Sequence, residues 1–150
     1  MQFSIKAAGM ADLPELVPLF NAYRVFYEQP SDLASAERFL RARFEGEESK
    51  VFIAVNDQAK GLGFVQLYPS FSSVSMRRVW ILNDLFVADY ARKQGVGEAL
   101  MERARQLAVE TEARGLQLET GKNNLPAQSL YEKLHYVKNE DYFVYYLSTL

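Results

Sequence analysis

The stretch Leu82–Leu100 constrains the fold of this chain more than any other part of the sequence. It begins with apolar, β-branched and aromatic residues, which predict a strand, and then turns through a short basic loop containing Gly95 and Gly97. An amphipathic helix is expected next. Its apolar face carries Val96, Leu100, Ala104 and Leu107. Because small residues leave backbone N–H groups free and a helix N-terminus favours an anion, we expect residues 92–97 to bind a pyrophosphate.

Two other phosphate-binding patterns are excluded by single residues. A Walker loop needs Gly-x-x-x-x-Gly-Lys-Ser/Thr, but the nearest stretch, ending at 121–123, has Leu116 at the first glycine position and lacks the hydroxyl. A dinucleotide fingerprint needs a third glycine where Leu100 stands. The turn of residues 92–97 is what remains, and ordinary strand-to-helix turns can share its spacing.

Composition narrows the class of protein. A chain of 150 residues is long enough for one domain with a sizeable core, and 9 Tyr and 10 Phe make disorder implausible. A net charge of −2 offers no electrostatic case for nucleic-acid binding. The absence of cysteine excludes disulfides, cysteine-based zinc sites and a thiol nucleophile. Without a signal-like N-terminus or a membrane-length apolar run, we expect a soluble cytoplasmic protein.

Periodicity and turn residues predict the order of elements. The expected elements are a strand at 3–7, helices from 12 to 30 and at 35–44, strands at 51–55, 61–67 and 78–87, a helix at 97–114, a strand at 116–120, a helix at 126–134 and a final strand at 142–147. Pro18 predicts a kink or a delayed helix start, and Gly115 a left-handed helix stop. The final aromatic strand is expected to close the sheet. Strand–helix–strand connectivity around 82–120 implies parallel pairing within a mixed α/β sheet.

A second motif follows one strand later, in Asn124–Lys133. Asn124 can cap a helix there. One face of that helix carries Ala127, Leu130, Tyr131 and Leu134. Together with residues 85–87 and 92–97, this motif resembles the GNAT superfamily of acyl-CoA-dependent N-acyltransferases. The resemblance runs from about residue 3 to the C-terminus and implies the GNAT fold, a central twisted mixed sheet flanked by helices. Where the family usually has glycine and an aromatic after the second motif, this chain has His135-Tyr136, and histidine tolerates a left-handed turn.

The resemblance implies acetyl-CoA as co-substrate, with no metal. Backbone N–H groups of residues 92–97 would hold the CoA pyrophosphate, and the strand at 85–87 would hydrogen-bond the pantetheine arm. Asn124 matches a cofactor-contacting position, and Tyr131 matches the tyrosine that protonates the departing thiolate. The implied cofactor-binding residues are Leu85, Phe86, Val87, Arg92, Lys93, Gln94, Gly95, Val96, Gly97, Asn124, Ala127 and Tyr131.

The reaction also needs a base, because a protonated amine has no lone pair for attack. Family members often carry a glutamate near residues 83 and 84, and strand alternation is expected to send Asn83 and Asp84 to opposite faces. Since Asn83 cannot take a proton, Asp84 is the better candidate, although a structural role for its carboxylate is equally compatible. Glu119 is a weaker alternative. His135, the single histidine, more often acts at a helix C-terminus as a cap.

Aromatic residues are expected on the acceptor side, where they could hold an ammonium by cation–π contact, although packing explains most of them. The candidates are Tyr23, Tyr27, Tyr68 and Phe71, with Phe26, Tyr142 and Phe143 in the same region. Without a cysteine, direct amine attack in a ternary complex is favoured over an acyl-enzyme. The acceptor could be a small-molecule or a peptide amine. Transfer of a longer acyl group and a non-catalytic acyl-CoA sensor stay open, and the final strand could pair across a homodimer interface.

Overall fold

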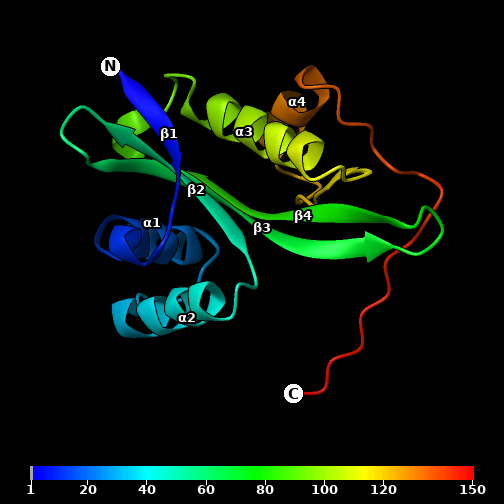
Figure 1. Ribbon diagram of the computed structural model, residues 1–150, viewed down its shortest axis with the longest axis horizontal. Helices are drawn as coiled ribbons and strands as arrows, with labels where there is room; N and C mark the ends of the chain where they lie inside the picture. Colours follow the sequence, from blue (N-terminus) through cyan, green and yellow to red (C-terminus); the bar gives the residue numbers. More distant parts are fainter. Residues whose placement is uncertain (1) are drawn as a thin grey trace. The chain divides into compact units, whose positions relative to one another are not determined.

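Five strands form one mixed sheet in the order β1-β2-β3-β4-β5 (Figure 1). The computed structural model describes residues 2–150, in two compact units, one ending at Leu118 and the other running from Glu119 to Leu150. The strands are β1 Phe3–Ala7, β2 Lys50–Asn56, β3 Gly61–Ser72, β4 Arg77–Val87 and β5 Gly115–Gln117. The first four pair antiparallel, while β4 and β5 are parallel, which confirms the predicted mixed sheet.

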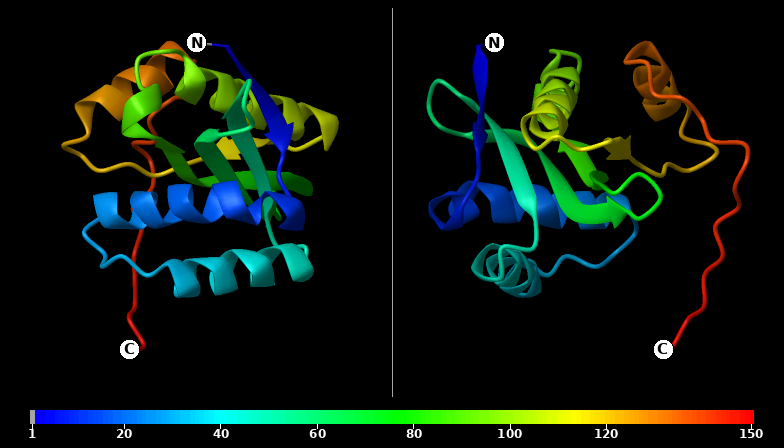
Figure 2. Two further views of the ribbon diagram at one scale, coloured as in Figure 1. Left: turned by 90° about the vertical axis from the view of Figure 1, so that its left-hand side faces the viewer. Right: turned by 45° about the vertical axis from the view of Figure 1, so that its right-hand side comes forward.

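Helices cover both faces of this sheet. They are α1 Leu13–Phe26, α2 Leu33–Glu45 and α3 Val96–Glu110, with short 3-10 turns η1 Met10–Asp12 and η2 Asp89–Ala91. Figures 1 and 2 show α1 and α2 on one face and α3 on the other. On the first face, Leu16 and Phe20 of α1 belong to one apolar core with Ile53 and Phe64 of the sheet. On the α3 side, the predicted apolar face of the helix is buried, which confirms the pattern read from the sequence.

An irregularity in β4 changes what its two halves can bind. Gln66 pairs with Asp84 and Leu67 with Leu82, so Asn83 is an extra residue without a partner in β3, which makes it a β-bulge. On the other side of β4, β5 pairs only with Val79–Ile81. The second half of β4 therefore continues to Val87 without a partner in β5.

Two predictions about helix ends are wrong. Helix α1 begins at Leu13 and includes Pro18, so its start is not delayed, and Leu16 and Phe20 are buried on either side of the proline. The kink at Pro18 stays a prediction. Helix α3 ends at Glu110, and the left-handed residue after it is Glu112, at φ 54°, whereas Gly115 starts β5. Thr111 is the C-cap of the helix, and both its N–H and its hydroxyl donate to the Leu107 carbonyl.

The second unit contains one helix, α4 Leu125–Lys133. Asn124 caps it by accepting a hydrogen bond from the Ala127 N–H at 3.3 Å, as predicted. His135 adopts the left-handed conformation at φ 72°, which confirms that histidine replaces the usual glycine there. The Tyr136 N–H donates to the Tyr131 carbonyl at 2.9 Å and closes the helix end.

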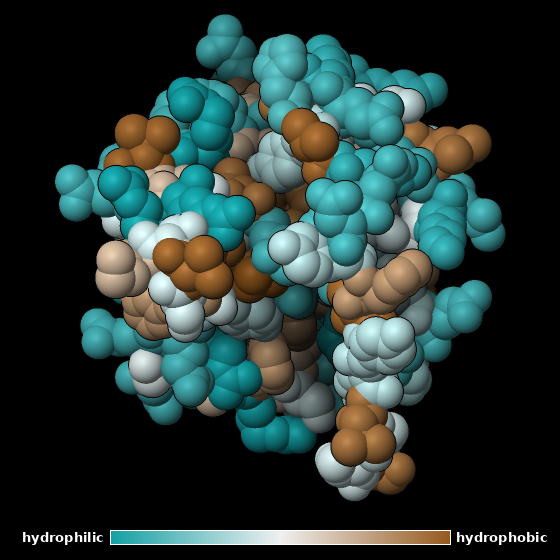
Figure 3. Space-filling view, turned by 90° about the vertical axis from the view of Figure 1, so that its right-hand side faces the viewer, coloured by the Kyte–Doolittle hydropathy of each residue, from teal (hydrophilic) through white to brown (hydrophobic). Residues whose placement is uncertain are grey.

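The predicted final strand at 142–147 is absent from the structure. These six residues are apolar, but each is between 79% and 92% exposed and none belongs to a ladder. Figure 3 shows brown and near-white side chains along the segment that ends at the lower edge of the view. The predicted strand at 116–120 is likewise shorter and ends at Gln117. A strand needs a partner for its backbone groups, so a high β-propensity does not form one alone.

Within the described residues, every helix is too short or too polar to cross a lipid bilayer. The single domain expected from the length of the chain stays a prediction.

Candidate active site

The turn before α3 has the backbone shape expected of an anion site. Lys93 and Gly95 both lie in the left-handed region, at φ 60° and 83°. Among the described residues, no group accepts a hydrogen bond from a backbone N–H of residues 92–97. Successive N–H groups in such a left-handed turn form a concave nest that suits an oxyanion. The turn therefore fits a pyrophosphate.

The side chain of Arg92 ties this turn to the end of β4. Its Nε donates to the Val87 carbonyl at 3.1 Å, and one terminal nitrogen lies 3.1 Å from an Asp89 carboxylate oxygen. The guanidinium carbon is 5.9 Å from the centre of the Phe86 ring. Because the guanidinium already has these partners, the backbone of the turn is the part most open to an anion.

Residues 85–87 lie between the bulge and the turn. Their side chains are half-buried, and this part of β4 has no partner in β5. Unpaired backbone groups on a strand edge can hydrogen-bond an extended ligand. The edge of β4 is therefore suited to the pantetheine arm that the family resemblance implies.

Asp84 lies in the interior just before this segment, with 3% of its surface exposed. The amide of Gln66 donates to one carboxylate oxygen at 2.6 Å, and the amide of Asn83 donates to the other at 2.8 Å. The prediction that Asn83 and Asp84 point to opposite faces is wrong. As the bulge residue, Asn83 departs from regular strand alternation, and its side chain reaches the neighbouring carboxylate.

Burial dominates the electrostatics of this cluster. It raises the pKa of Asp84, while hydrogen bonds from Gln66, Asn83 and Tyr23 act in the opposite direction. Burial also raises the pKa of Tyr23, and the carboxylate of Asp84 adds to that rise. The same two causes raise the pKa of Tyr68 to about 12. Two phenols therefore stay protonated beside a carboxylate that holds a proton more readily than usual.

The predicted acceptor aromatics separate into two groups. Tyr23 packs between the sheet and Tyr27, with ring centres 5.8 Å from Phe64 and 5.0 Å from Tyr27. Its hydroxyl lies 3.4 Å from the Asn83 carbonyl. Phe71 instead pairs with Arg78, six positions from Asp84 along β4, or roughly 20 Å away. The structure thus places Tyr23 and Tyr68 near Asp84, with Tyr27 packed on Tyr23, and leaves Phe71 apart.

Gln66 belongs to this cluster although it was not predicted. It is fully buried, and its carbonyl oxygen has no hydrogen-bond partner among the described residues. A signal was present in the sequence, because Gln66 is the single polar side chain in the otherwise apolar run Gly61–Leu67. A buried amide in such a strand usually has a polar partner.

The motif residues of the second unit are arranged around α4. Asn124 is occupied as the helix cap, and the Tyr131 ring centre lies 6.0 Å from that of Tyr136. Glu119 and His135, the weaker candidates for a base, are both exposed. Among residues 2–150, no three His, Asp or Glu side chains gather in a way that could hold a metal ion.

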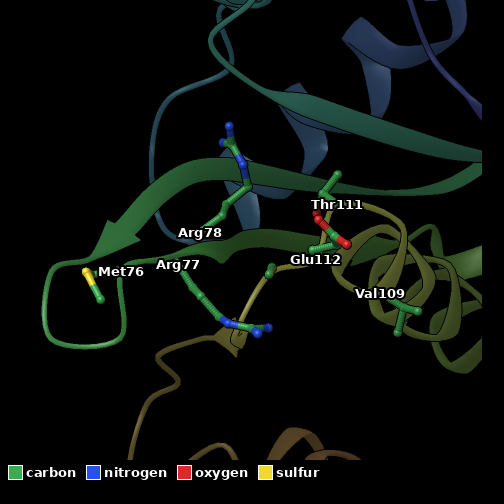
Figure 4. Close-up of a pocket in the computed structure, with 7 residues that line it drawn as sticks. Met76, Arg77, Arg78, Val109, Thr111 and Glu112 are labelled. Atoms are coloured by element: carbon green, nitrogen blue, oxygen red, sulfur yellow. The ribbon is translucent and has the colours of Figure 1, made fainter.

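A separate cavity of about 560 Å³ lies at the other end of β4 (Figure 4). It is lined by Met76, Arg77, Arg78, Val109, Thr111, Glu112 and Ala113. Arg77 and Arg78 point to opposite sides of the strand in Figure 4, as alternation requires. None of the predicted site residues lines this cavity.

Similarity to known proteins shows which family the chain belongs to. Residues 14–136 match the acetyltransferase (GNAT) family. The chain belongs to the GNAT family of acetyltransferases. It is thus an acyl-CoA-dependent N-acetyltransferase.

Relatives of this GNAT chain match it over most of its length. It is 46% identical to the uncharacterized N-acetyltransferase YhfO of Bacillus subtilis, over 97% of each chain. It is 37% identical to a probable acetyltransferase of Haemophilus influenzae, over 72% of this chain and 74% of the relative. A crystal structure of a probable acetyltransferase superposes with a TM-score of 0.93 at 40% identity, covering 98% of both chains.

The substitution Asp84→Asn is expected to raise the free energy of unfolding by about 1 kcal/mol at neutral pH. It removes a charge from a residue that is only 3% exposed. Gln66 can then turn its unpaired carbonyl oxygen toward the new amide. Urea denaturation of both proteins measures the difference. The exposed substitution Asp57→Asn serves as control and should change stability by less than about 0.5 kcal/mol.

The gain from Asp84→Asn should depend on pH. Because burial raises the folded-state pKa of this carboxyl, the folded wild-type protein binds the proton more readily than the unfolded chain. Wild-type stability therefore falls as pH rises from the unfolded pKa through the folded pKa. The advantage of the variant should be full above the folded pKa and vanish below the unfolded value. A gain that persists unchanged at acid pH would contradict this account.

Proposed function

We propose that this GNAT enzyme moves an acetyl group from acetyl-CoA to a primary amine by direct attack in a ternary complex. The observation that carries the proposal is the sequence of features along β4: a buried carboxylate at Asp84, an edge without a β5 partner at 85–87, and the left-handed turn at 92–97. Together they supply a base, a site for an extended arm and a nest for a pyrophosphate, in that order along the chain.

Each step has a residue suited to it. Asp84 takes the proton of the acceptor ammonium, directly or through water, and a backbone N–H on the free edge of β4 polarises the thioester carbonyl. Tyr131 donates a proton to the leaving thiolate, with Asn124 and Ala127 contacting the cofactor at the start of α4. A phenol pKa near 10 lies above that of a thiol, so this donation needs a close, desolvated thiolate. Asn83 orients the carboxylate through its 2.8 Å hydrogen bond.

The acceptor we propose is an amine with a slender apolar body. Tyr27 packs edge-to-face on Tyr23, whose hydroxyl lies at the bulge next to Asp84, and such an aromatic pair suits an ammonium through cation–π contact. With a net charge of −2, neither a nucleic acid nor a membrane surface is proposed as partner. A cytoplasmic location belongs to the same proposal.

The central experiment measures thiol release from acetyl-CoA across a panel of primary amines. We expect Tyr131→Phe to lower kcat by roughly 100-fold while the Kd for CoA, from calorimetry, changes little. Wild-type protein that binds CoA but releases no thiol with any amine would favour a non-catalytic sensor. Faster release from a longer acyl-CoA than from acetyl-CoA would point to the alternative acyl donor.

The glycine turn predicts a selective loss of CoA affinity. An alanine Cβ at Gly95 would meet no atom within 4 Å, so Gly95→Ala acts through the positive φ alone, at about 1–2 kcal/mol for an L-residue. We expect the Kd for CoA to rise about tenfold. Gly9→Ala is the matched control, since Gly9 also precedes a helical turn with open space but has φ −142°. Equal losses in both variants would refute the role of the turn.

We also propose a homodimer in which residues 142–147 add as a strand to the sheet of a second copy. Six exposed apolar residues in a row are a liability that pairing removes, and β5 forms an open edge of the sheet. Because each copy has one such segment and one such edge, a two-fold arrangement satisfies both.

Val144→Pro should convert the dimer to a monomer in sedimentation experiments, because proline cannot donate to a ladder. Ser148→Pro lies beyond the apolar segment and should leave the dimer intact. Wild-type protein that sediments as a monomer at all concentrations would rule out this proposal.

A further inference from the structure

We propose that Tyr23 is a catalytic residue that passes the proton of the acceptor ammonium to Asp84 through its hydroxyl. This inference rests on the proposed function, in which Asp84 is the base. It assigns the contact between acceptor and base to a residue of α1, in a position that the GNAT motifs do not include.

The first argument is access. Asp84 is 3% exposed, and its two oxygens already accept hydrogen bonds from Gln66 at 2.6 Å and Asn83 at 2.8 Å. An amine in the surrounding site therefore has little direct approach to the carboxylate. Tyr23 is only half-buried, and its hydroxyl donates to the Asn83 carbonyl at 3.4 Å, close enough to the Asp84 carboxylate for each group to shift the pKa of the other. Its hydroxyl thus has one side toward the base and belongs to a side chain that reaches the surface.

The second argument is the fixed position of the ring. Phe64 and Phe86 of the sheet pack edge-on against Tyr23, with ring centres 5.8 Å and 6.3 Å away. On the helix side, Phe20 and Tyr27 hold the same ring at 6.2 Å and 5.0 Å. The hydroxyl lies 3.4 Å from the Asn83 carbonyl, directly at the bulge. Packing on all these sides keeps the hydroxyl beside residues 83 and 84.

The proton balance is simple. As one N–H bond of the ammonium breaks, its proton moves to the Tyr23 oxygen, and the original phenolic proton moves to an oxygen of Asp84. The products are a neutral amine with a free lone pair, a neutral tyrosine and a protonated carboxyl. Burial and the charge of Asp84 keep Tyr23 from ionising, so the hydroxyl hands on protons and does not store charge.

Other ionisable groups around the cluster are few. Tyr27 and Tyr68 face Tyr23 electrostatically, and Arg43 of α2 acts on Tyr68. Tyr68 is the alternative relay residue, because the charge of Asp84 also raises its pKa. Asp84 acts on Tyr68 through its charge alone, whereas the Tyr23 hydroxyl is hydrogen-bonded to the Asn83 carbonyl, next to the carboxylate in the chain. The geometry therefore favours Tyr23.

The test compares two acceptors in three hydroxyl-deletion variants. The acceptors are the best amine of the panel and a fluorinated analogue whose ammonium pKa lies below the assay pH, so that it is already neutral. The variants are Tyr23→Phe, the rival Tyr68→Phe and the control Tyr90→Phe. Tyr90 is a matched control because its hydroxyl also makes one hydrogen bond to a backbone carbonyl, that of Gly61 at 2.6 Å, and the carboxylate that acts on it is Glu15, not Asp84.

We expect Tyr23→Phe to lower kcat/KM roughly 100-fold with the protonated amine and less than about twofold with the neutral analogue. Tyr90→Phe should change kcat/KM by the same factor for the two acceptors. The ratio of the two rates is internal to each protein sample, so partial unfolding of a variant cannot imitate the effect. Raising the pH should also restore the kcat/KM of Tyr23→Phe with the first amine, because more of that amine is then unprotonated.

The outcomes distinguish the relay from the base. An equal loss for both amines in Tyr23→Phe would make Tyr23 a packing residue and overturn the relay. The amine-dependent loss in Tyr68→Phe instead would transfer the role to Tyr68. If Asp84→Asn keeps full activity, or if the wild-type protein releases no thiol, the proposed function itself fails.

Discussion

The β-bulge at Asn83 is the feature on which the rest of the site depends. One extra residue in β4 breaks the regular alternation of side chains, and the Asn83 amide meets the Asp84 carboxylate beside it. Pairing with β5 covers only Val79–Ile81, so the strand beyond the bulge keeps a free edge. A regular strand in this place would separate the two side chains onto opposite faces.

A buried carboxylate stabilises the fold poorly, and its surroundings show how the cost is reduced. Two side-chain amides donate to Asp84 and a phenol approaches it, yet the net effect of the environment still raises its pKa. Gln66 keeps one carbonyl oxygen without a partner in the same cluster. A buried carboxyl group with a raised pKa and a buried amide oxygen without a partner are typical of functional sites. The membership in the GNAT family and this cluster are therefore consistent with each other.

Most elements could be predicted because their signals are local. The spacing of Val96, Leu100, Ala104 and Leu107 defines a helix face wherever it packs, and Asn124 caps α4 through a contact three residues away. Residues 142–147 show the opposite case. Their β-propensity is strong, but a strand also requires a partner for its backbone, and sequence patterns do not say where that partner is. The helix stop predicted at Gly115 is also wrong, because α3 already ends at Glu110, with Thr111 as its C-cap and the Thr111 hydroxyl bonded to the Leu107 carbonyl.

The sequence by itself determined the family motifs, the mixed sheet, the glycine turn and Asp84 as the candidate base, because each depends on residue type at short spacing. Only the tertiary structure decided which side chains surround that carboxylate. Gln66, Tyr23 and Asp84 are separated by 18 to 61 positions in the chain, and only the pairing of β3 with β4 and the packing of α1 brings them together. Contacts at that range depend on strand register and helix packing, which local patterns leave open.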